Sequence, residues 1–192
     1  MRHLLGLVAL FVLLSASPAS ASGFYVGTYG GWNQDDVISA PFLNSKGGYV
    51  AGAVIGTRLP SVPGVRIEAD LSLRSNETDL FGGFISADHD TTAVMGNVIW
   101  DLPLNIGPVR PYALAGVGVA QTQATFENVA LLRLEATGVA YQLGAGLQTD
   151  IADGVTAGIG YRYFAGPELE VLGLQLSDGT NHSVVASVNF AF

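Results

Sequence analysis

Alternating charged residues in one short segment are the first candidates for chemistry in this chain. From Val65 to Arg74 the apolar residues occupy odd positions, and the charged residues occupy even positions. In an extended strand, this spacing places the charges on one face. With two charges that stand on the non-aliphatic side of other alternating segments, the set is Arg66, Glu68, Asp70, Arg74, Asp101 and Arg162. Because an unpaired charge in a narrow interior is costly, we expect these side chains to neutralise one another or to hold water.

A histidine and a serine stand side by side at His182 and Ser183, a few residues after Asp178. A nucleophile and its base are built from such residue types. Neighbouring residues of a strand point to opposite faces, so His182 and Ser183 do not readily share one site. The sequence therefore predicts a polar junction between a loop and a strand here, and no catalytic residues.

Metal, cofactor and nucleic-acid sites find little support in the sequence. His89 lies between Asp88 and Asp90, but one histidine in an acidic segment is typical of a solvated surface. The chain has no cysteine, and its glycines at 116–118 lack the lysine of a phosphate-binding loop. We expect no metal and no cofactor. The net charge of −8 argues against a nucleic-acid partner.

The elements that must position these residues are strands, because apolar and polar residues alternate with a period of two. Eight such segments occur, at residues 23–33, 47–58, 65–75, 91–102, 110–123, 137–150, 155–164 and 182–192. Each is about as long as the ~9–11 residues of a tilted membrane-spanning strand, and an even count suits a barrel with both termini on one side. The pattern predicts an all-β fold, a closed antiparallel transmembrane β-barrel of about eight strands.

The connections between these segments alternate strictly in length. Residues 60–64, 103–108 and 152–154 are short turns that contain proline or glycine. The longer segments hold most of the acidic residues, at 34–46, 76–90, 124–136 and 165–181. This alternation is typical of short periplasmic turns and longer extracellular loops. Because residues 129–134 are largely apolar, a ten-stranded barrel stays open as an alternative.

The N-terminal residues have the features of a signal peptide. Arg2 and His3 form a short basic region, residues 4–14 are an apolar core, and residues 19–21 are an Ala-Ser-Ala cleavage site. The apolar run is too short to span a membrane. We expect cleavage after residue 21, which leaves residues 22–192 as one barrel domain.

Alternation alone does not separate a membrane barrel from a soluble one, so the position of the aromatic residues carries more weight. In the barrel interpretation they gather near both ends of the strands, as in the interfacial girdles of membrane barrels. The residues assigned to this girdle are Phe24, Trp32, Trp100, Tyr112, Tyr141 and Tyr163, with Phe190 and Phe192 beside them at the turn end. The exterior is therefore expected to face lipid, and the charged set to lie in a narrow lumen.

Several segments resemble one family of membrane barrels. Residues 23–33 (GFYVGTYGGWN) resemble the opening strand of the opacity-protein-like and OmpA-like outer-membrane β-barrels, and residues 110–118 (RPYALAGVG) resemble a middle strand. Residues 158–163 resemble the penultimate strand, and the chain ends Asn-Phe-Ala-Phe. The resemblance implies a bacterial outer-membrane location, and it implies that Phe190 and Phe192 form the signal read by the assembly machinery.

Three functions follow as hypotheses, in order of preference. The first is a structural or surface-interaction barrel, whose lumen is largely plugged and whose partners are outer-membrane lipid, lipopolysaccharide and the assembly machinery. The second is a narrow pore for small solutes. The third is a lipid-modifying enzyme. The sequence does not name a ligand for the loops.

Overall fold

The computed structural model describes residues 23–35, 43–80, 85–104, 106–126, 133–167, 169–171, 174–177 and 179–192. The expected signal peptide at residues 1–21 lies outside this part. The described strands are β1 (Phe24–Asp35), β2 (Leu43–Arg58), β3 (Val65–Leu80), β4 (Ile85–Asp101), β5 (Val109–Phe126), β6 (Arg133–Ala152), β7 (Val155–Ala165), β8 (Leu169–Val171), β9 (Leu174–Ser177) and β10 (Thr180–Ala191). No helix among the described residues is long and apolar enough to cross a membrane.

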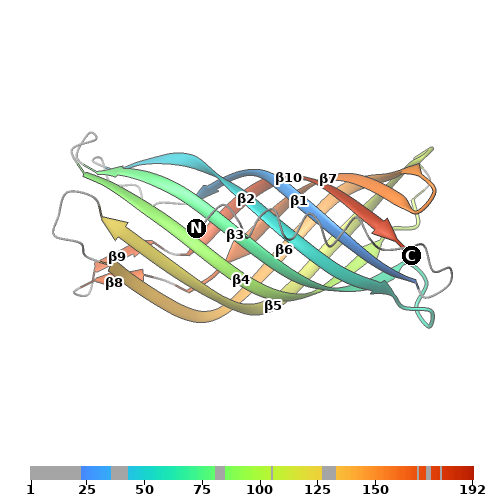
Figure 1. The fold of residues 1–192 in the computed structure, drawn as a ribbon, viewed down its shortest axis with the longest axis horizontal. Coiled ribbons are helices and arrows are strands. Elements are labelled where there is room, and N and C mark those ends of the chain that lie inside the picture. The colour runs from blue at the N-terminus through green and yellow to red at the C-terminus, as the bar shows by residue number, and fades with distance from the viewer. Residues whose placement is uncertain are drawn as a thin grey trace.

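Eight of these strands form a closed barrel in the order β1-β10-β7-β6-β5-β4-β3-β2 (Figure 1). Every neighbouring pair is antiparallel, and β1 and β10 close the barrel with Trp32 opposite Val184. The eight-stranded prediction is confirmed, and the ten-stranded alternative is wrong. The two additional strands, β8 and β9, pair only with each other in a small separate sheet at the end of the barrel opposite the short turns (Figure 1).

The short connections are tight turns at one end of the barrel. Gly64 precedes β3 with a φ of 80°, and Gly154 precedes β7 with a φ of 72°. Both values lie in the left-handed region that favours glycine. The carbonyl of Gly64 accepts from the Asp101 amide at 2.7 Å, and that of Gly154 accepts from the Ala191 amide at 2.7 Å. These bonds tie each turn to the strand beside it.

The barrel strands extend further at the opposite end than the alternation predicted. The backbone of residues 43–46 pairs with residues 77–80, and residues 85–90 continue β4 beyond its expected start at 91. Likewise, β5 reaches Phe126 and β6 begins at Arg133. Regular backbone pairing therefore continues into segments that the sequence analysis assigned to the long connections.

Burial alternates along the middle of the barrel strands. The exposed apolar side chains point away from the lumen and are half exposed or more, among them Leu71, Leu73, Val94, Val98, Val117, Val119, Val139, Leu143 and Ile159. Their neighbours point inward and are buried, and most of these are polar or small. The molecule thus has an apolar exterior and a polar interior, the reverse of a soluble barrel.

Candidate functional site

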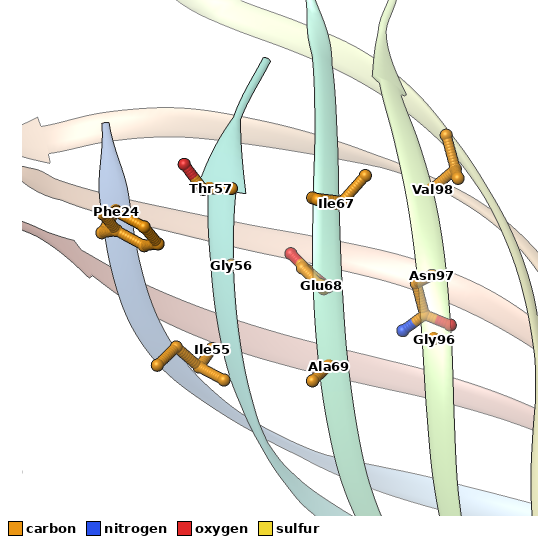
Figure 2. A pocket seen from close by; sticks show the side chains of 10 residues that line it. All are labelled: Phe24, Ile55, Gly56, Thr57, Ile67, Glu68, Ala69, Gly96, Asn97 and Val98. Atoms are coloured by element: carbon orange, nitrogen blue, oxygen red, sulfur yellow. The ribbon is translucent and has the colours of Figure 1, made fainter. Parts of the chain in front are cut away.

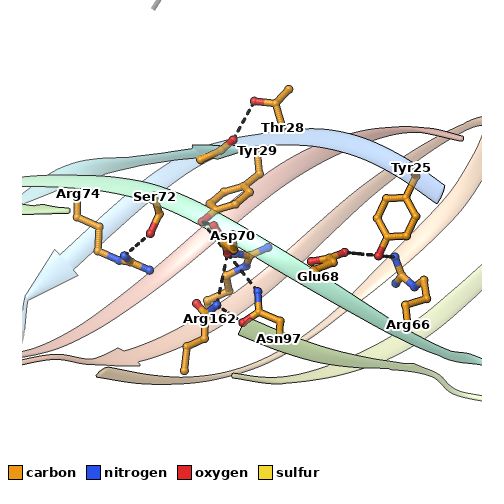
Figure 3. Close-up of polar contacts among 12 residues, drawn as sticks. Tyr25, Thr28, Tyr29, Arg66, Glu68, Asp70, Ser72, Arg74, Asn97 and Arg162 are labelled. Atoms are coloured by element: carbon orange, nitrogen blue, oxygen red, sulfur yellow. Dashed lines mark hydrogen bonds and ion pairs between the residues drawn. The ribbon is translucent and has the colours of Figure 1, made fainter. Parts of the chain in front are cut away.

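Polar side chains fill the lumen in three layers, of which Figure 3 shows much of the first two. We call them the turn-side layer, the central layer and the loop-side layer. The turn-side layer is Tyr25, Arg66, Glu68, Asp101 and Gln148. The central layer is Tyr29, Asp70, Asn97, Gln142 and Arg162. The loop-side layer is Asn33, Asp35, Asn76, Asn181 and Ser183.

Arg66 organises the turn-side layer. Its Nη2 donates to Asp101 at 2.8 Å and to Gln148 at 3.3 Å. Its Nη1 lies 3.6 Å from Glu68 and donates to the Tyr25 hydroxyl at 3.3 Å. The Tyr25 hydroxyl in turn donates to Glu68 at 2.6 Å. One cation thus faces two carboxylates in this layer, and charge-assisted hydrogen bonds hold all three groups.

Asp70 organises the central layer, as Arg66 organises the turn-side layer (Figure 3). Arg162 Nη1 donates to Asp70 Oδ2 at 3.0 Å, and the Tyr29 hydroxyl donates to Oδ1 at 2.9 Å. The side-chain amides of Asn97 and Gln142 donate to Oδ2 at 3.3 and 3.4 Å. The guanidinium carbon of Arg162 also lies 3.9 Å from the Tyr29 ring centroid. The carboxylate is fully enclosed by these four donors, with 0% of its side chain exposed.

Arg74 lies between the central and loop-side layers, with fewer partners. Its Nη1 donates to Ser72 Oγ at 2.8 Å, and its guanidinium carbon lies 3.8 Å from the centroid of the Phe164 ring. Its Nε and Nη2 are buried and have no hydrogen-bond partner among the described residues. A cation stacked on an aromatic ring is stabilised by the ring electrons. Phe164 is also the largest member of a buried apolar cluster that fills one side of the lumen with Ala93, Met95, Ala120 and Ala140.

The loop-side layer consists mainly of uncharged amides. Asn33 Nδ2 donates to Asn181 at 2.6 Å and to Asn76 at 3.1 Å. Asn76 Nδ2 donates to Asp35 at 2.6 Å and to Asn181 at 3.1 Å. The Ser183 hydroxyl donates to Asn33 Oδ1 at 2.5 Å. All five side chains are buried, so this network lies inside the loop-side end of the barrel.

Small cavities remain near the turn end. One cavity of about 20 Å³ lies against Arg66, Tyr112 and Arg162, and another of about 30 Å³ lies against Tyr25, Arg58 and Arg66. Each is large enough for about one water molecule. Because the Nε atoms of Arg66 and Arg162 have no partner in the described part of the chain, a water in such a cavity has donors to bind.

The structure brings the six predicted lumen charges into one interior, where three arginines face three carboxylates. Five of them are less than a tenth exposed, and Asp101 is part-buried. The sequence interpretation missed the uncharged partners, especially Tyr25, Tyr29 and Gln142. Both tyrosines occupy odd positions of β1, whereas the outward-facing Phe24 occupies an even one. Simple alternation from Phe24 would therefore have placed both tyrosine rings inside.

Five of the six residues assigned to the girdle lie on the outer face. At the turn end, Phe24 and Trp100 are exposed, as is Phe190 beside them. At the loop end, Trp32 and Tyr141 are exposed, and the Tyr163 ring lies 6.2 Å from that of Tyr141.

The assignment of Tyr112 to the girdle is wrong, because its ring faces the lumen. A Cβ atom added at Gly146 would fall 2.7 Å from the Tyr112 hydroxyl, and one at Gly160 would fall 2.4 Å from it. The ring therefore occupies the space that these two glycines leave open. Strand β5 is apolar on both faces, so its sequence pattern does not distinguish the inward residues from the outward ones.

The other candidate chemistry does not assemble. The Ser183 hydroxyl bonds Asn33 inside the lumen, whereas His182 Nδ1 forms a hydrogen bond with the Tyr161 hydroxyl on the outer face. The strand thus separates the histidine from the serine, as expected. Among the described residues, no three histidine or acidic side chains converge as metal ligands would.

Phe192 follows β10 and remains tied to the barrel. Its amide donates to the carbonyl of Phe24 at 3.1 Å, next to the seam where β10 meets β1. The last aromatic residue thus lies at the turn end, where the barrel closes.

Comparisons with known proteins agree with this architecture. The family model of the outer membrane protein beta-barrel domain matches residues 6–192. Among solved structures, neisserial surface protein A is similar with a TM-score of 0.64 and 17% identity, covering 89% of this chain and 98% of that chain. A major outer membrane protein from Thermus thermophilus is similar with a TM-score of 0.59 and 9% identity, covering 88% and 98%. A search of curated proteins found no match.

Proposed function

The chain belongs to the outer membrane protein β-barrel family and lies in the bacterial outer membrane, and from this premise we propose that it is a structural and surface protein with a plugged lumen. The observation that carries the proposal is the direct pairing of charged side chains in the lumen. Arg66 binds the part-buried Asp101 and Arg162 binds the buried Asp70, and amide and tyrosine side chains complete the same layers. A network of this kind stabilises a closed interior and leaves little room for solutes.

We assign the short turns to the periplasm and the long connections to the cell exterior. Strand β1 begins and β10 ends at the turn end of the barrel, where Phe192 bonds Phe24. In outer-membrane barrels the short turns are periplasmic and the longer loops are external. The terminal aromatic residues then remain beside the assembly machinery, which we propose as a partner during insertion.

The long connections carry the surface function in this proposal. Eleven of the sixteen acidic residues fall in the four long segments at 34–46, 76–90, 124–136 and 165–181. Apart from Asp35, which is buried in the loop-side layer, these acids keep the exposed surface solvated and limit its contact with the phosphates of lipopolysaccharide, unless divalent cations intervene. The apolar exterior of the barrel contacts the lipid around it.

Deletion of the protein tests this function through two measurements: entry of a hydrophobic dye and uptake of small polar solutes. A structural role predicts that a deletion strain admits more of a hydrophobic dye, while its uptake of small polar solutes does not fall. Expression of the unaltered chain should restore the barrier, and expression of Leu71→Arg should not, because the exposed Leu71 must face lipid. A loss of solute uptake with an intact dye barrier would contradict the proposal and favour a pore.

A further inference from the structure

A groove crosses the outer face of the barrel on the turn-side half of β1 to β4 (Figure 2). Its volume is about 530 Å³. Phe24, Ile55, Ile67 and Val98 form its walls and are about half exposed. Glu68 and Asn97 also border it, but their polar groups are bonded inside the lumen. The groove therefore presents an apolar surface to whatever lies outside the barrel.

Strand register brings two small residues together in the lining of the groove. Ala69 on β3 lies directly opposite Gly96 on β4, so two small residues meet on the outer face. One step toward the turns, Ile67 faces Val98, and one step toward the loops, Leu71 faces Val94. The pair of small residues thus forms a depression between two rows of larger apolar side chains.

Packing of the barrel does not require glycine at position 96. A Cβ atom added there would meet nothing closer than the Val117 carbonyl oxygen, at an ordinary distance of 3.8 Å. The inward-facing Gly116 differs, because a Cβ there would fall 2.0 Å from the side chain of Asn97. Glycine within a strand is unfavourable and often marks a place where another molecule approaches closely. Gly96 therefore contributes to the shape of the outer surface and not to the fit of the lumen.

We propose that this groove seats one acyl chain of a phospholipid. The groove is continuous with the apolar exterior that faces lipid in this family, and its walls offer no charged group to a polar partner. Contact with lipid tails supplies the dispersion attraction that an empty depression would lack. A second copy of the barrel is the weaker candidate, since no hydrophobic effect drives two apolar surfaces together within a bilayer.

The choice of lipid rests on the sidedness given under the proposed function. The groove lies toward the turns, hence toward the periplasmic leaflet, where the surrounding lipid is phospholipid. Trp100 lies on the outer face two residues beyond Val98 and is 50% exposed. It therefore reports on lipid that occupies the groove, and with Trp32→Phe it becomes the only tryptophan of the chain.

The test fills the groove in barrels that carry Trp32→Phe and are reconstituted in phospholipid nanodiscs. Gly96→Leu and Ala69→Leu place larger side chains in the depression. Gly30→Leu is the matched control, because a Cβ at this outward glycine also meets only a carbonyl oxygen, that of Val50 at 3.8 Å, away from the groove. A gel shift on boiling confirms that each variant is folded, and fully brominated nanodiscs give each variant's maximal quenching for normalisation.

The readouts are quenching of Trp100 by a small fraction of brominated phospholipid and the lipid retained in native mass spectrometry. We expect the parent barrel to show more quenching than random lipid contact produces and to retain a phospholipid. Gly96→Leu and Ala69→Leu should lose both signals, and Gly30→Leu should keep them. Unchanged quenching and lipid retention in the two groove variants would overturn the proposal. So would a dimer of the parent barrel that is lost in Gly96→Leu and Ala69→Leu, because a second copy would then occupy the groove. Neither result bears on the dye barrier of the deletion strain, so the two proposals fail separately.

Discussion

At the scale of single residues, we expect the stability of the lumen to depend strongly on Asp70. Its carboxylate accepts hydrogen bonds from Tyr29, Asn97, Gln142 and Arg162 and has no exposed surface. Asp70→Asn keeps the shape of the side chain but leaves Arg162 without its counter-charge. Breaking a buried ion pair in this way costs about 3–5 kcal/mol, and less where water enters. We expect a loss of this size in the free energy of unfolding, measured with urea in lipid vesicles.

An exposed ion pair of the same chemistry provides the control. Arg110 and Asp150 form two hydrogen bonds of 2.6 and 2.7 Å at the turn end, with side chains 39% and 52% exposed. Because solvent screens such a pair, Asp150→Asn should cost under about 1 kcal/mol. Equal losses for Asp70→Asn and Asp150→Asn would show that water reaches the central layer freely.

The individual charged residues of the lumen could be predicted from alternation, but their pairing could not. Which arginine meets which carboxylate depends on the register between distant strands, as when Arg162 on β7 reaches Asp70 on β3. Tyr112 shows a second limit. Its strand has apolar or small residues on both faces, so the sequence does not reveal that glycines at 146 and 160 make room for its ring.

At the scale of the strand, an inserted charge would meet lipid on the outer face and polar side chains on the lumen face. Leu71 is 52% exposed on the apolar exterior, between the lumen residues Asp70 and Ser72. Leu71→Arg should therefore cost on the order of 2–4 kcal/mol in unfolding free energy near the bilayer midplane. Leu104→Arg, at an exposed position in a short turn, should cost roughly 0–1 kcal/mol, because charges near the interface are tolerated. Full tolerance of Leu71→Arg would mean that this face does not meet lipid.

The last strand carries a prediction about assembly. Phe192 lies at the turn end beside the seam between β1 and β10. If this terminal aromatic is both interfacial and part of the assembly signal, Phe192→Asp should lower the amount of folded barrel in outer-membrane fractions. Phe192→Tyr keeps an aromatic ring and should restore most of it. A normal yield of Phe192→Asp would remove the role assigned to this residue.

Strand identity followed from the sequence where one face is apolar and the other polar. The alternation from Val65 to Leu73 placed β3 correctly, but it did not reveal that pairing continues to Leu80. Beyond the bilayer both faces meet water, so the physical cause of the alternation disappears while the backbone hydrogen bonds continue. For the same reason the small β8–β9 sheet was not expected.

At the scale of the whole molecule, the alternation of short and long connections predicts which parts are accessible from outside the cell. A protease applied to intact cells should cut within residues 76–90 or 165–181 and should spare the turn at residues 60–64. Mass spectrometry of the fragments locates the cuts, and permeabilised cells serve as the control for access to the turns. Cuts confined to residues 60–64 in intact cells would reverse the orientation proposed here.

The most direct test of the account is the conductance of the purified barrel in planar lipid bilayers. If the three layers close the lumen, the unaltered protein should show no large, steady conductance, even though a gel shift on boiling confirms that it is folded. Glu68→Gln removes one carboxylate from the turn-side layer and should lower stability without opening a defined channel. A large and steady conductance in the unaltered protein, changing sharply with Glu68→Gln, would contradict the plugged lumen and identify the protein as a narrow pore.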